Sequence, residues 1–411
     1  MGKVFNLLAA SPRLPAPHAI ALALLLSVSW LRTGSVAPAA PQTLADQGYR
    51  ELWSGLGQGR PGALPAAADK FRQALAMDAA FPYRWSDLGN VLAAAGDRDS
   101  ARYCFRRSLD LAPNSPQIAM RAANFHFQEG ETGPALRLGA TVLRVTASYD
   151  SMVFNSWTRL DSDQNEVLQL GIGANARAAD AFFRFLMGSN PIGPGAESRL
   201  FETWKWIEGR SYVTRPLARA WAGWLDGRGR EQDAFLIWKR YVALDSSYGV
   251  SNWIDNSGFE SAPAGLGFDW RIQPSPGVKV GLDSAIARSG HSSLRLEFDG
   301  SENLDFHIVA QRLWLPAGRY RLTGWMRTAN LSTDQGLALV LNGVATPALN
   351  GVHDWTRVSA DAAVPNTVGN NVDNDAASLG EVQVVRQRSW RFDGKLRGIA
   401  WIDDVELRRI D

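Results

Sequence analysis

A tryptophan stands among arginines on the polar face of one predicted strand, residues 319–327. The alternating side chains that belong in the core are Tyr320, Leu322 and Met326. The polar face carries Arg319, Arg321, Thr323, Trp325 and Arg327. An indole can stack on a sugar ring, and a guanidinium can donate hydrogen bonds to hydroxyl groups. We therefore expect Trp325, Arg321 and Arg327 to form a carbohydrate-binding surface.

The preceding predicted strand adds three polar residues of one parity, Asp305, His307 and Gln311. If this strand lies beside residues 319–327, the two sets of side chains form a polar cleft with an aromatic floor. The alternative is that Trp325 packs beneath a loop or against the helical part of the chain, because aromatic side chains are more often structural than exposed.

No catalytic constellation is recognisable in the sequence. It contains no Gly-x-Ser-x-Gly elbow, no His-Glu-x-x-His motif and no glycine-rich phosphate loop. None of the five histidines lies at metal-ligand spacing from another: His18, His126, His291, His307 and His353. We therefore expect a protein that is not an enzyme. A polysaccharide-processing enzyme stays open as the alternative, because a glycosidase needs two carboxylates that the fold, and not the spacing, brings together.

Length and composition describe a globular chain of more than one domain. Its 411 residues exceed one ordinary core, so two or three domains are expected. The net charge of +2 argues against nucleic acid as a partner. The single cysteine, Cys104, excludes an intrachain disulfide and is expected to be a small buried residue.

Residues 1–32 have the pattern of a signal peptide or an N-terminal membrane anchor. Lys3 and Arg13 precede an apolar run at residues 18–31, which is shorter than the about 20 residues of a spanning helix. Small residues at 37–40 suit cleavage, within an Ala/Pro-rich linker at 33–44. An uncleaved anchor in the inner membrane stays open, and so does a buried N-terminal helix. The first two readings predict an exported protein, periplasmic or anchored to the cytoplasmic membrane facing outward.

Residues 82–115 have the pattern of one helical hairpin. Its first helix is marked by Trp85, Leu88, Gly89 and Leu92, its turn by Gly96 and Asp97, and its second helix by Ala101, Phe105 and Ser108. Pro113 ends it. The unit resembles the tetratricopeptide repeat, of about 34 residues, which buries its apolar face by stacking on further copies.

Related units flank this hairpin along the helical half of the chain. One unit earlier the matching residues are Gly55, Ala67, Phe71 and Ala74, and one unit later they are Ala123, Gly130 and Ala135. Another match spans 215–248. We expect repeats over 45–149, degenerate helical repeats over 150–214, and a C-terminal repeat over 215–250, which together form a solenoid.

The resemblance to this repeat implies a peptide-binding groove, because the ninth residue of each unit points into it. Those positions hold Asn90 and Asn124, with Tyr83 and Ser86 beside them. An amide side chain can donate to and accept from an extended peptide backbone, so a protein partner is expected there. The alternative is a set of solvated surface residues, since exposed asparagine is common.

From Ser251 onward the hydrophobic period changes to two. Predicted strands at 292–298, 319–327, 336–341, 381–392 and 398–408 are typical of an all-β sandwich. Short motifs at 256–260, 289–294, 316–322, 355–359 and 401–407 resemble, in this order, carbohydrate-binding modules of the galactose-binding-like jelly roll. The expected fold is therefore multidomain, an α-helical TPR-like solenoid followed by an all-β jelly-roll sandwich over 251–411.

The resemblance to these modules also implies a structural calcium ion. In them an acid near the first strand and one in the closing strand hold the metal, and the matching residues here are Glu260 and Asp404. Carboxylates and backbone carbonyls suit Ca²⁺, which takes about six to eight oxygen ligands. The alternative is that the two acids cap turns.

These expectations favour a non-enzymatic exported scaffold of the bacterial envelope. Its solenoid would bind a protein and its sandwich a polysaccharide, and resemblance suggests a role in exopolysaccharide or O-antigen assembly. Besides the enzyme, a purely structural protein in which the sandwich caps the solenoid and binds no ligand stays open.

Overall fold

The computed structural model describes residues 40–58, 60–159, 163–188, 194–365 and 377–411. The predicted targeting segment lies outside these residues, as does most of the predicted linker. The described part of the linker, from Ala40, is already helical. In the described ranges, no helix has the length and apolar character needed to cross a membrane.

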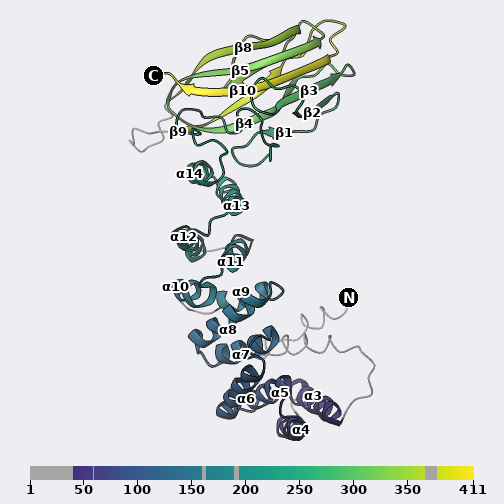
Figure 1. The fold of residues 1–411 in the computed structure, drawn as a ribbon, viewed down its shortest axis with the longest axis vertical. Coiled ribbons are helices and arrows are strands. Elements are labelled where there is room, and N and C mark those ends of the chain that lie inside the picture. Colours follow the sequence, from purple (N-terminus) through teal and green to yellow (C-terminus); the bar gives the residue numbers. More distant parts are fainter. Residues whose placement is uncertain (1–39, 59, 160–162, 189–193, 366–376) are drawn as a thin grey trace. The chain divides into compact units, whose positions relative to one another are not determined.

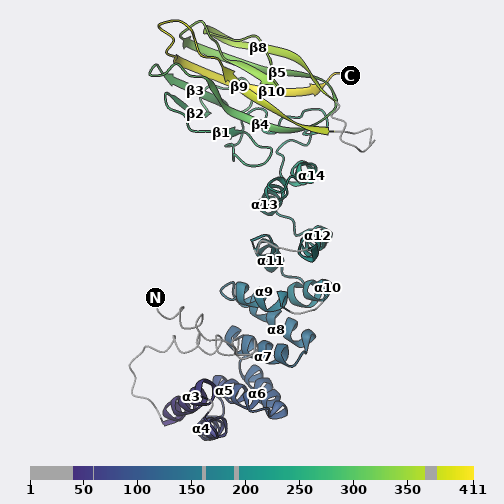
Figure 2. The same cartoon turned by 180° about the vertical axis from the view of Figure 1, so that it is seen from behind.

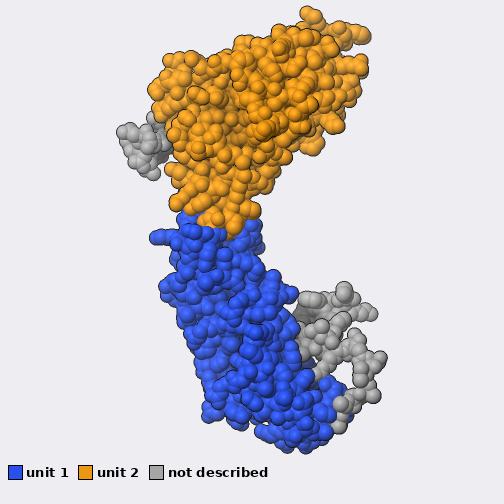
Figure 3. Space-filling view, viewed as in Figure 1, with its two compact units in different colours: residues 1–212 blue, residues 213–411 orange. Residues whose placement is uncertain are grey.

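The chain divides into two compact units, residues 1–212 and 213–411 (Figure 3). Hairpins of antiparallel helices succeed one another in the first unit (Figure 1). Its helices are α3 (Ala40–Gln58), α4 (Ala63–Met77), α5 (Pro82–Ala94), α6 (Arg98–Leu111), α7 (Pro116–Gln128), α8 (Thr132–Val145), α9 (Asp150–Thr158), α10 (Gln164–Glu166), the π-helix η2 (Val167–Ile172), α11 (Ala176–Gly188) and α12 (Pro194–Gly209).

Local sequence explains where the central hairpins begin and turn. Proline occupies the first position of α5 and of α7, where its missing N–H costs no helical hydrogen bond. Asp97 caps α6 by accepting a hydrogen bond from the Ser100 N–H. Gly96 makes the turn between α5 and α6 with a φ of +85°, a conformation that other residues rarely adopt.

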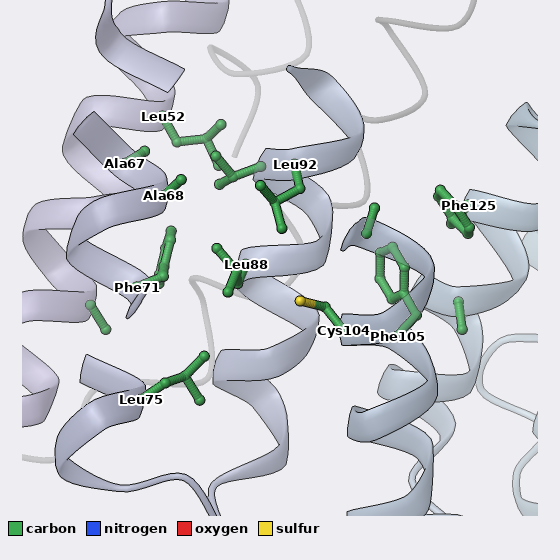
Figure 4. Packing of buried hydrophobic residues seen from close by; sticks show 14 residues of the cluster. Leu52, Ala67, Ala68, Phe71, Leu75, Leu88, Leu92, Cys104, Phe105 and Phe125 are labelled. Carbon is green, nitrogen blue, oxygen red and sulfur yellow. The ribbon is translucent and has the colours of Figure 1, made fainter. Parts of the chain in front are cut away.

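The core of the first hairpins is a continuous layer of aliphatic and aromatic side chains (Figure 4). A β-carbon on Gly89 would lie 3.1 Å from the Phe105 ring, so the glycine allows α5 and α6 to approach closely. Cys104 is buried in this layer, as predicted, and burial raises the pKa of its thiol to about 11.

The second unit begins with one more helical hairpin, α13 (Arg215–Asp226) and α14 (Glu231–Tyr241). Two five-stranded antiparallel sheets follow. Their strands are β1 (Arg271–Ile272), β2 (Val278–Asp283), β3 (Ser293–Asp299), β4 (Phe306–Pro316), β5 (Gly318–Leu331), β6 (Ala338–Leu341), β7 (Val344–Ala345), β8 (Gly351–Val364), β9 (Ala377–Arg386) and β10 (Arg397–Arg409). One sheet has the order β1-β4-β9-β6-β7 and the other β2-β3-β10-β5-β8. Figures 1 and 2 show the two sheets from opposite sides, with β6 and β7 unlabelled. The α-helical repeats and the following β-sandwich confirm the predicted fold class.

The last helical hairpin packs against the sandwich. Trp238 on α14 donates a hydrogen bond from Nε1 to Asp255 Oδ2 at 2.8 Å, and Phe235 stacks on Trp253. Arg312 on β4 pairs with Asp226 at the end of α13 at 2.7 Å. The expected boundary at residue 251 therefore separates helix from strand, whereas the compact units divide after residue 212.

Candidate functional site

The outer face of β5 and β8 is the first candidate site. Tyr320, Leu322 and Met326 are fully buried, as predicted, so the residues that alternate with them face outward. Paired residues of antiparallel strands share a face, and Trp325 pairs with Arg357 on β8. Trp325 itself is half-buried on this surface.

Two of the predicted sugar-binding arginines already have acidic neighbours. Arg321 makes two hydrogen bonds with Asp361, of 2.7 and 2.8 Å, and these hold the pKa of Asp361 below its ordinary value. Arg327 is held more loosely, because its Nε lies 3.8 Å from a carboxylate oxygen of the exposed Asp354. The Arg327 guanidinium is therefore the freer donor of the two.

Arg288, which was not among the site residues predicted from the sequence, lies over the ring of Trp325. The Arg288 guanidinium carbon lies 3.9 Å from the centre of the indole, a cation–π contact. Arg288 also forms an ion pair with Asp404. A sugar that stacks on this face of the indole must displace Arg288.

The predicted cleft between residues 305–311 and 319–327 does not form, because β4 and β5 lie in different sheets. Asp305 and His307 are exposed at the start of β4, away from Trp325. A bulge between Phe306 and Val309 then shifts the parity, so Gln311 turns inward. Gln311 is fully buried and exchanges two hydrogen bonds with the Asp255 backbone, of 2.8 and 3.0 Å. Its role is structural, and the prediction that these three residues share a site with Trp325 was wrong.

The two predicted calcium ligands meet at one loop, residues 288–292. Glu260 accepts hydrogen bonds from the backbone N–H groups of His291 and Ser292. Asp404, which has a φ of +46°, accepts one from the Ser289 hydroxyl at 2.7 Å.

Asp403, a third acid, lies at the same loop. Its buried carboxylate accepts from the N–H groups of Arg288 and Ser289, and burial raises its pKa. A β-carbon on Gly258 would lie within 4 Å of atoms of Glu260, Asp403 and Asp404. Carboxylate oxygens are the ligands that calcium prefers, but here they accept hydrogen bonds from the loop backbone and from Arg288. Over the described ranges, no three histidine, cysteine or acidic side chains converge as a ready-made metal site, so an ion would need backbone oxygens as well.

The second candidate site lies on the first helices of consecutive repeats. Asn90 on α5 and Asn124 on α7 are both half-buried. Within the described part of the chain, neither amide side chain has a hydrogen-bond partner. Asn124 also lines a small, mostly apolar hollow between α7, α8 and α9, together with Met120, Phe127 and Trp157. Its volume of about 20 Å³ has room for about one water molecule, so the two amides, and not the hollow, are the candidate peptide-binding groups.

The other two predicted groove residues have structural partners. Ser86 is fully buried, donates to the Tyr83 carbonyl and accepts from Arg121, so its assignment to the groove was wrong. The hydroxyl groups of Tyr83 and Ser115 lie 3.2 Å apart in a hydrogen bond. Tyr83 is half-buried and stays beside the candidate groove.

Sequence reasoning also missed a buried charged network across three repeats. Arg121 on α7 donates to Asp87 on α5 at 2.6 Å, and the Tyr49 hydroxyl on α3 donates to the same carboxylate oxygen at 2.6 Å. The side chains of Arg121 and Asp87 are only 6% and 1% exposed. The signal was present, since Asp87 and Arg121 are 34 residues apart and so occupy one repeat position.

A further pair of aromatic residues was missed in the loop after β9. Trp390 and Phe392 are fully exposed, with relative exposures of 99% and 108%. The loop is held by the buried Arg386, which donates to the Gly394 carbonyl and to Asn303 Oδ1, both at 3.1 Å. The sequence did carry a signal for this pair. Two aromatic residues flank Arg391, directly before the turn-forming residues Asp393 and Gly394.

Comparison with known proteins identifies one segment. The model of the tetratricopeptide repeat matches residues 82–115, the hairpin of α5 and α6. This confirms the resemblance that the hairpin pattern predicted. No curated protein matches the chain significantly.

Solved structures resemble one half of the chain or the other. The CBM22-1 xylan-binding domain from Paenibacillus barcinonensis is 15% identical, with coverage of 38% of this chain and 92% of that chain and a TM-score of 0.22. The CBM22-1 and GH10 modules of a Clostridium thermocellum xylanase, complexed with xylohexaose, are 12% identical, with coverage of 38% and 28% and a TM-score of 0.26. A tetratricopeptide repeat protein from Parabacteroides merdae is 13% identical, with coverage of 49% and 91% and a TM-score of 0.24.

Proposed function

We propose that this chain is a non-enzymatic binding protein whose sandwich binds a polysaccharide and whose helical repeats bind a protein partner. The observation that carries the proposal is the outer face of β5 and β8, where a half-buried Trp325 lies among arginines on a rigid sheet. Aromatic rings and guanidinium donors on a preformed surface suit sugar rings and their hydroxyl groups. The repeat match at residues 82–115 supports the protein-binding half.

Calorimetric titration of the full chain against a panel of neutral and acidic polysaccharides tests the carbohydrate half. We expect saturable binding that Trp325→Ala weakens by about tenfold, which corresponds to about 1.4 kcal/mol. Trp390→Ala is the matched control, because Trp390 is also exposed but lies in a loop at the end of the other sheet. Failure of every polysaccharide to bind would remove this half of the proposal.

The assignment as a non-enzyme has its own test. Incubation of the full chain with the same polysaccharides should release no reducing sugar, because two acids near Trp325 already have arginine partners, Asp361 with Arg321 and Asp404 with Arg288. Release above the level of a heat-inactivated sample would favour the polysaccharide-processing enzyme instead.

The protein-binding half rests on the unpaired amides of Asn90 and Asn124. We propose that they bind an extended peptide backbone, because each amide can both donate to a peptide carbonyl and accept from a peptide N–H. Affinity capture from envelope extracts should retain a protein that the Asn90→Ala, Asn124→Ala double variant releases. Asn155→Ala is the control, because the Asn155 amide already donates to the Ser151 carbonyl of its own helix at 2.7 Å. Equal capture by all three proteins would contradict the groove.

We propose further that Glu260 and Asp404 hold a calcium ion that stabilises the junction of loop 288–292 with the closing strand. Calcium would bring a divalent charge to carboxylates that Arg288, Ser289 and backbone N–H groups now neutralise. Added Ca²⁺ should raise the melting temperature of the wild type and leave that of Glu260→Gln and Asp404→Asn unchanged. Mg²⁺ at the same concentration controls for ionic strength, and an equal shift in the variants would contradict the site.

The place of action follows from the N-terminal pattern and stays a proposal. We propose export across the cytoplasmic membrane and a role in assembling a surface polysaccharide of the exopolysaccharide or O-antigen kind. Support comes from the basic and apolar pattern of residues 1–32 and from the polysaccharide face. Fractionation of cells that produce the chain should place it in the periplasm or the inner membrane, and cytoplasmic recovery would contradict export.

A further inference from the structure

We propose that the polysaccharide taken by the β5–β8 face is acidic, and that Arg357 and Arg327 bind its carboxylate groups beside Trp325. This inference rests on the proposed carbohydrate-binding function and specifies its ligand class.

Among the described residues, Arg357 has no acidic partner on this face. It is exposed, lies opposite Trp325 in the register of β5 and β8, and has no ion pair or hydrogen bond with any described residue. An open depression at the same place is lined by Arg321, Arg357, Ser359 and Asp361. The guanidinium therefore points its donors at a surface that a ligand can reach.

The neighbouring arginines show why Arg357 is distinctive. Arg321 is matched by Asp361 through two short hydrogen bonds, and Arg288 is matched by Asp404. Arg327 lies beyond hydrogen-bond distance of Asp354, 88% of whose side chain is exposed, and exposed pairs of this kind contribute little. Positive charge is thus left unmatched at Arg357, opposite Trp325 on β8, and only weakly matched at Arg327, two residues further along β5, which favours an anionic ligand.

The chemistry of these groups favours a carboxylate on a sugar. A guanidinium can donate two parallel hydrogen bonds to one carboxylate, and such charge-assisted bonds are stronger than those to neutral hydroxyl groups. Side chains paired across antiparallel strands start about 4.5–5.5 Å apart. A uronate at the edge of the indole therefore lies within reach of Arg357, while the exposed hydroxyl of Ser359 can meet a sugar hydroxyl.

Arg288 explains why charge, and not stacking, would dominate recognition. It occupies a face of the Trp325 ring at 3.9 Å, so a neutral sugar has no free ring surface there without displacing a cation that Asp404 holds. A polyuronate can instead bind at the edge of the indole and satisfy Arg357 and Arg327.

Calorimetric titration of the full chain tests the proposal with three polysaccharides that carry uronate groups: the polyuronates polygalacturonate and alginate, and hyaluronate, in which every second sugar is a uronate. Each is compared with its methyl ester, which keeps the sugar backbone and removes the charge, and with xylohexaose as a neutral chain. At least one of the three should bind about tenfold more tightly than its ester. Arg357→Gln should abolish that difference. Arg388→Gln, which removes the same charge from an exposed loop position, should preserve it.

The possible results distinguish failure of the acidic specificity from failure of the proposed carbohydrate binding. Equal affinity for acid and ester, or tight binding of xylohexaose alone, would overturn the acidic specificity and leave carbohydrate binding intact. Binding to none of these chains, nor to the wider panel, would overturn both. Equal loss in Arg357→Gln and Arg388→Gln would show unspecific charge attraction and overturn the site. Loss in Trp390→Ala with Arg357→Gln unaffected would move the site to the exposed loop and overturn it as well.

Discussion

The helical repeats and the sandwich bring their candidate residues together over very different distances along the chain. Asn90 and Asn124 are one repeat apart, on successive first helices α5 and α7. Arg288 and Asp404 are 116 residues apart and meet through the pairing of distant strands. Residues one repeat length apart occupy equivalent places on successive units, whereas the neighbours of a residue in a sheet depend on the order of the strands. The position of a site on the repeats can therefore be predicted from repeat spacing, but a site on the sandwich requires the structure.

The buried network of the repeats should give the largest effect in this comparison. Asp87→Ala removes the carboxylate that holds Arg121 and accepts from Tyr49. It leaves a buried guanidinium unpaired, so we expect a loss of about 3–5 kcal/mol in the free energy of unfolding of the first unit. Scanning calorimetry should show a lower transition temperature for this unit.

A double variant distinguishes the contribution of the Asp87–Arg121 ion pair from that of the packing around these two side chains. Asp87→Leu combined with Arg121→Met removes both charges and keeps apolar volume, and should recover most of the loss. A single variant that costs less than about 1 kcal/mol would show that the network adds little to repeat stacking.

The matching test in the second unit concerns Asp255, which is 2% exposed. Its carboxylate accepts from Trp238 Nε1 at 2.8 Å and from the N–H groups of Leu244 and Asn256, both at 3.0 Å. Asp255→Ala leaves these donors without an acceptor, so we expect a loss of about 3 kcal/mol in the stability of the second unit. Asp255→Asn keeps one acceptor oxygen and should cost about half as much.

The calorimetric transition that Asp255→Ala lowers shows whether the α13–α14 hairpin is part of the first or the second unit. If α13 and α14 are structurally part of the second unit, calorimetry of Asp255→Ala should move that transition and leave the first unit unchanged. A shift confined to the first unit would contradict the division after residue 212.

The same contrast shows how far sequence reasoning reached. The alternation that put Tyr320, Leu322 and Met326 in the core depends on one strand alone, and it was confirmed. The cleft with Gln311 was wrong because adjacency in the chain does not imply adjacency in a sheet, and because a bulge in β4 reverses parity.

The close contact between Gly48 on α3 and Phe71 on α4 was not apparent from the repeat pattern of the sequence. Gly55 matched Gly89 by position, yet Gly48 is the residue that packs on Phe71, where a β-carbon would lie 3.0 Å from the ring. Gly55, about two turns later on the 19-residue α3, packs instead on the start of α4, where a β-carbon would lie 3.1 Å from Ala63. The repeat alignment therefore marked a glycine at a close approach of two helices, but not the one beside Phe71.

A smaller effect is expected from removing Arg288, which lies over the Trp325 ring of the candidate site. Arg288→Ala removes the cation–π contact with Trp325 and the ion pair with Asp404, both partly exposed. We expect a stability loss of about 0.5–1 kcal/mol and tighter binding of neutral oligosaccharides, because the ring face becomes free. Calorimetric titration with xylohexaose measures the second effect. Arg388→Ala is the control, and unchanged affinity in Arg288→Ala would mean that stacking on this face is not used.

The smallest expected effect is a pH dependence confined to the repeats. Glu131, just before α8, accepts hydrogen bonds from Arg102 at 2.6 and 2.8 Å and from His126 at 2.6 Å. The Arg102 contact, then that of His126, lowers the pKa of Glu131 to about 2, against about 4.3 in an unfolded chain. A lowered folded pKa gives stability that is complete above the unfolded pKa and is lost as pH falls toward the folded one.

The melting temperature of the first unit should therefore exceed that of Glu131→Gln at pH 6, and the difference should shrink between about pH 4.3 and pH 2. The difference should be small, because the Glu131 side chain is 32% exposed and solvent screens its charge. Salt should reduce it further, whereas a contact made by packing would not respond to salt. A difference that stays constant across this pH range would assign the effect of Glu131→Gln to geometry at the start of α8, and the charge of Glu131 would then add nothing to the stacking of neighbouring repeats.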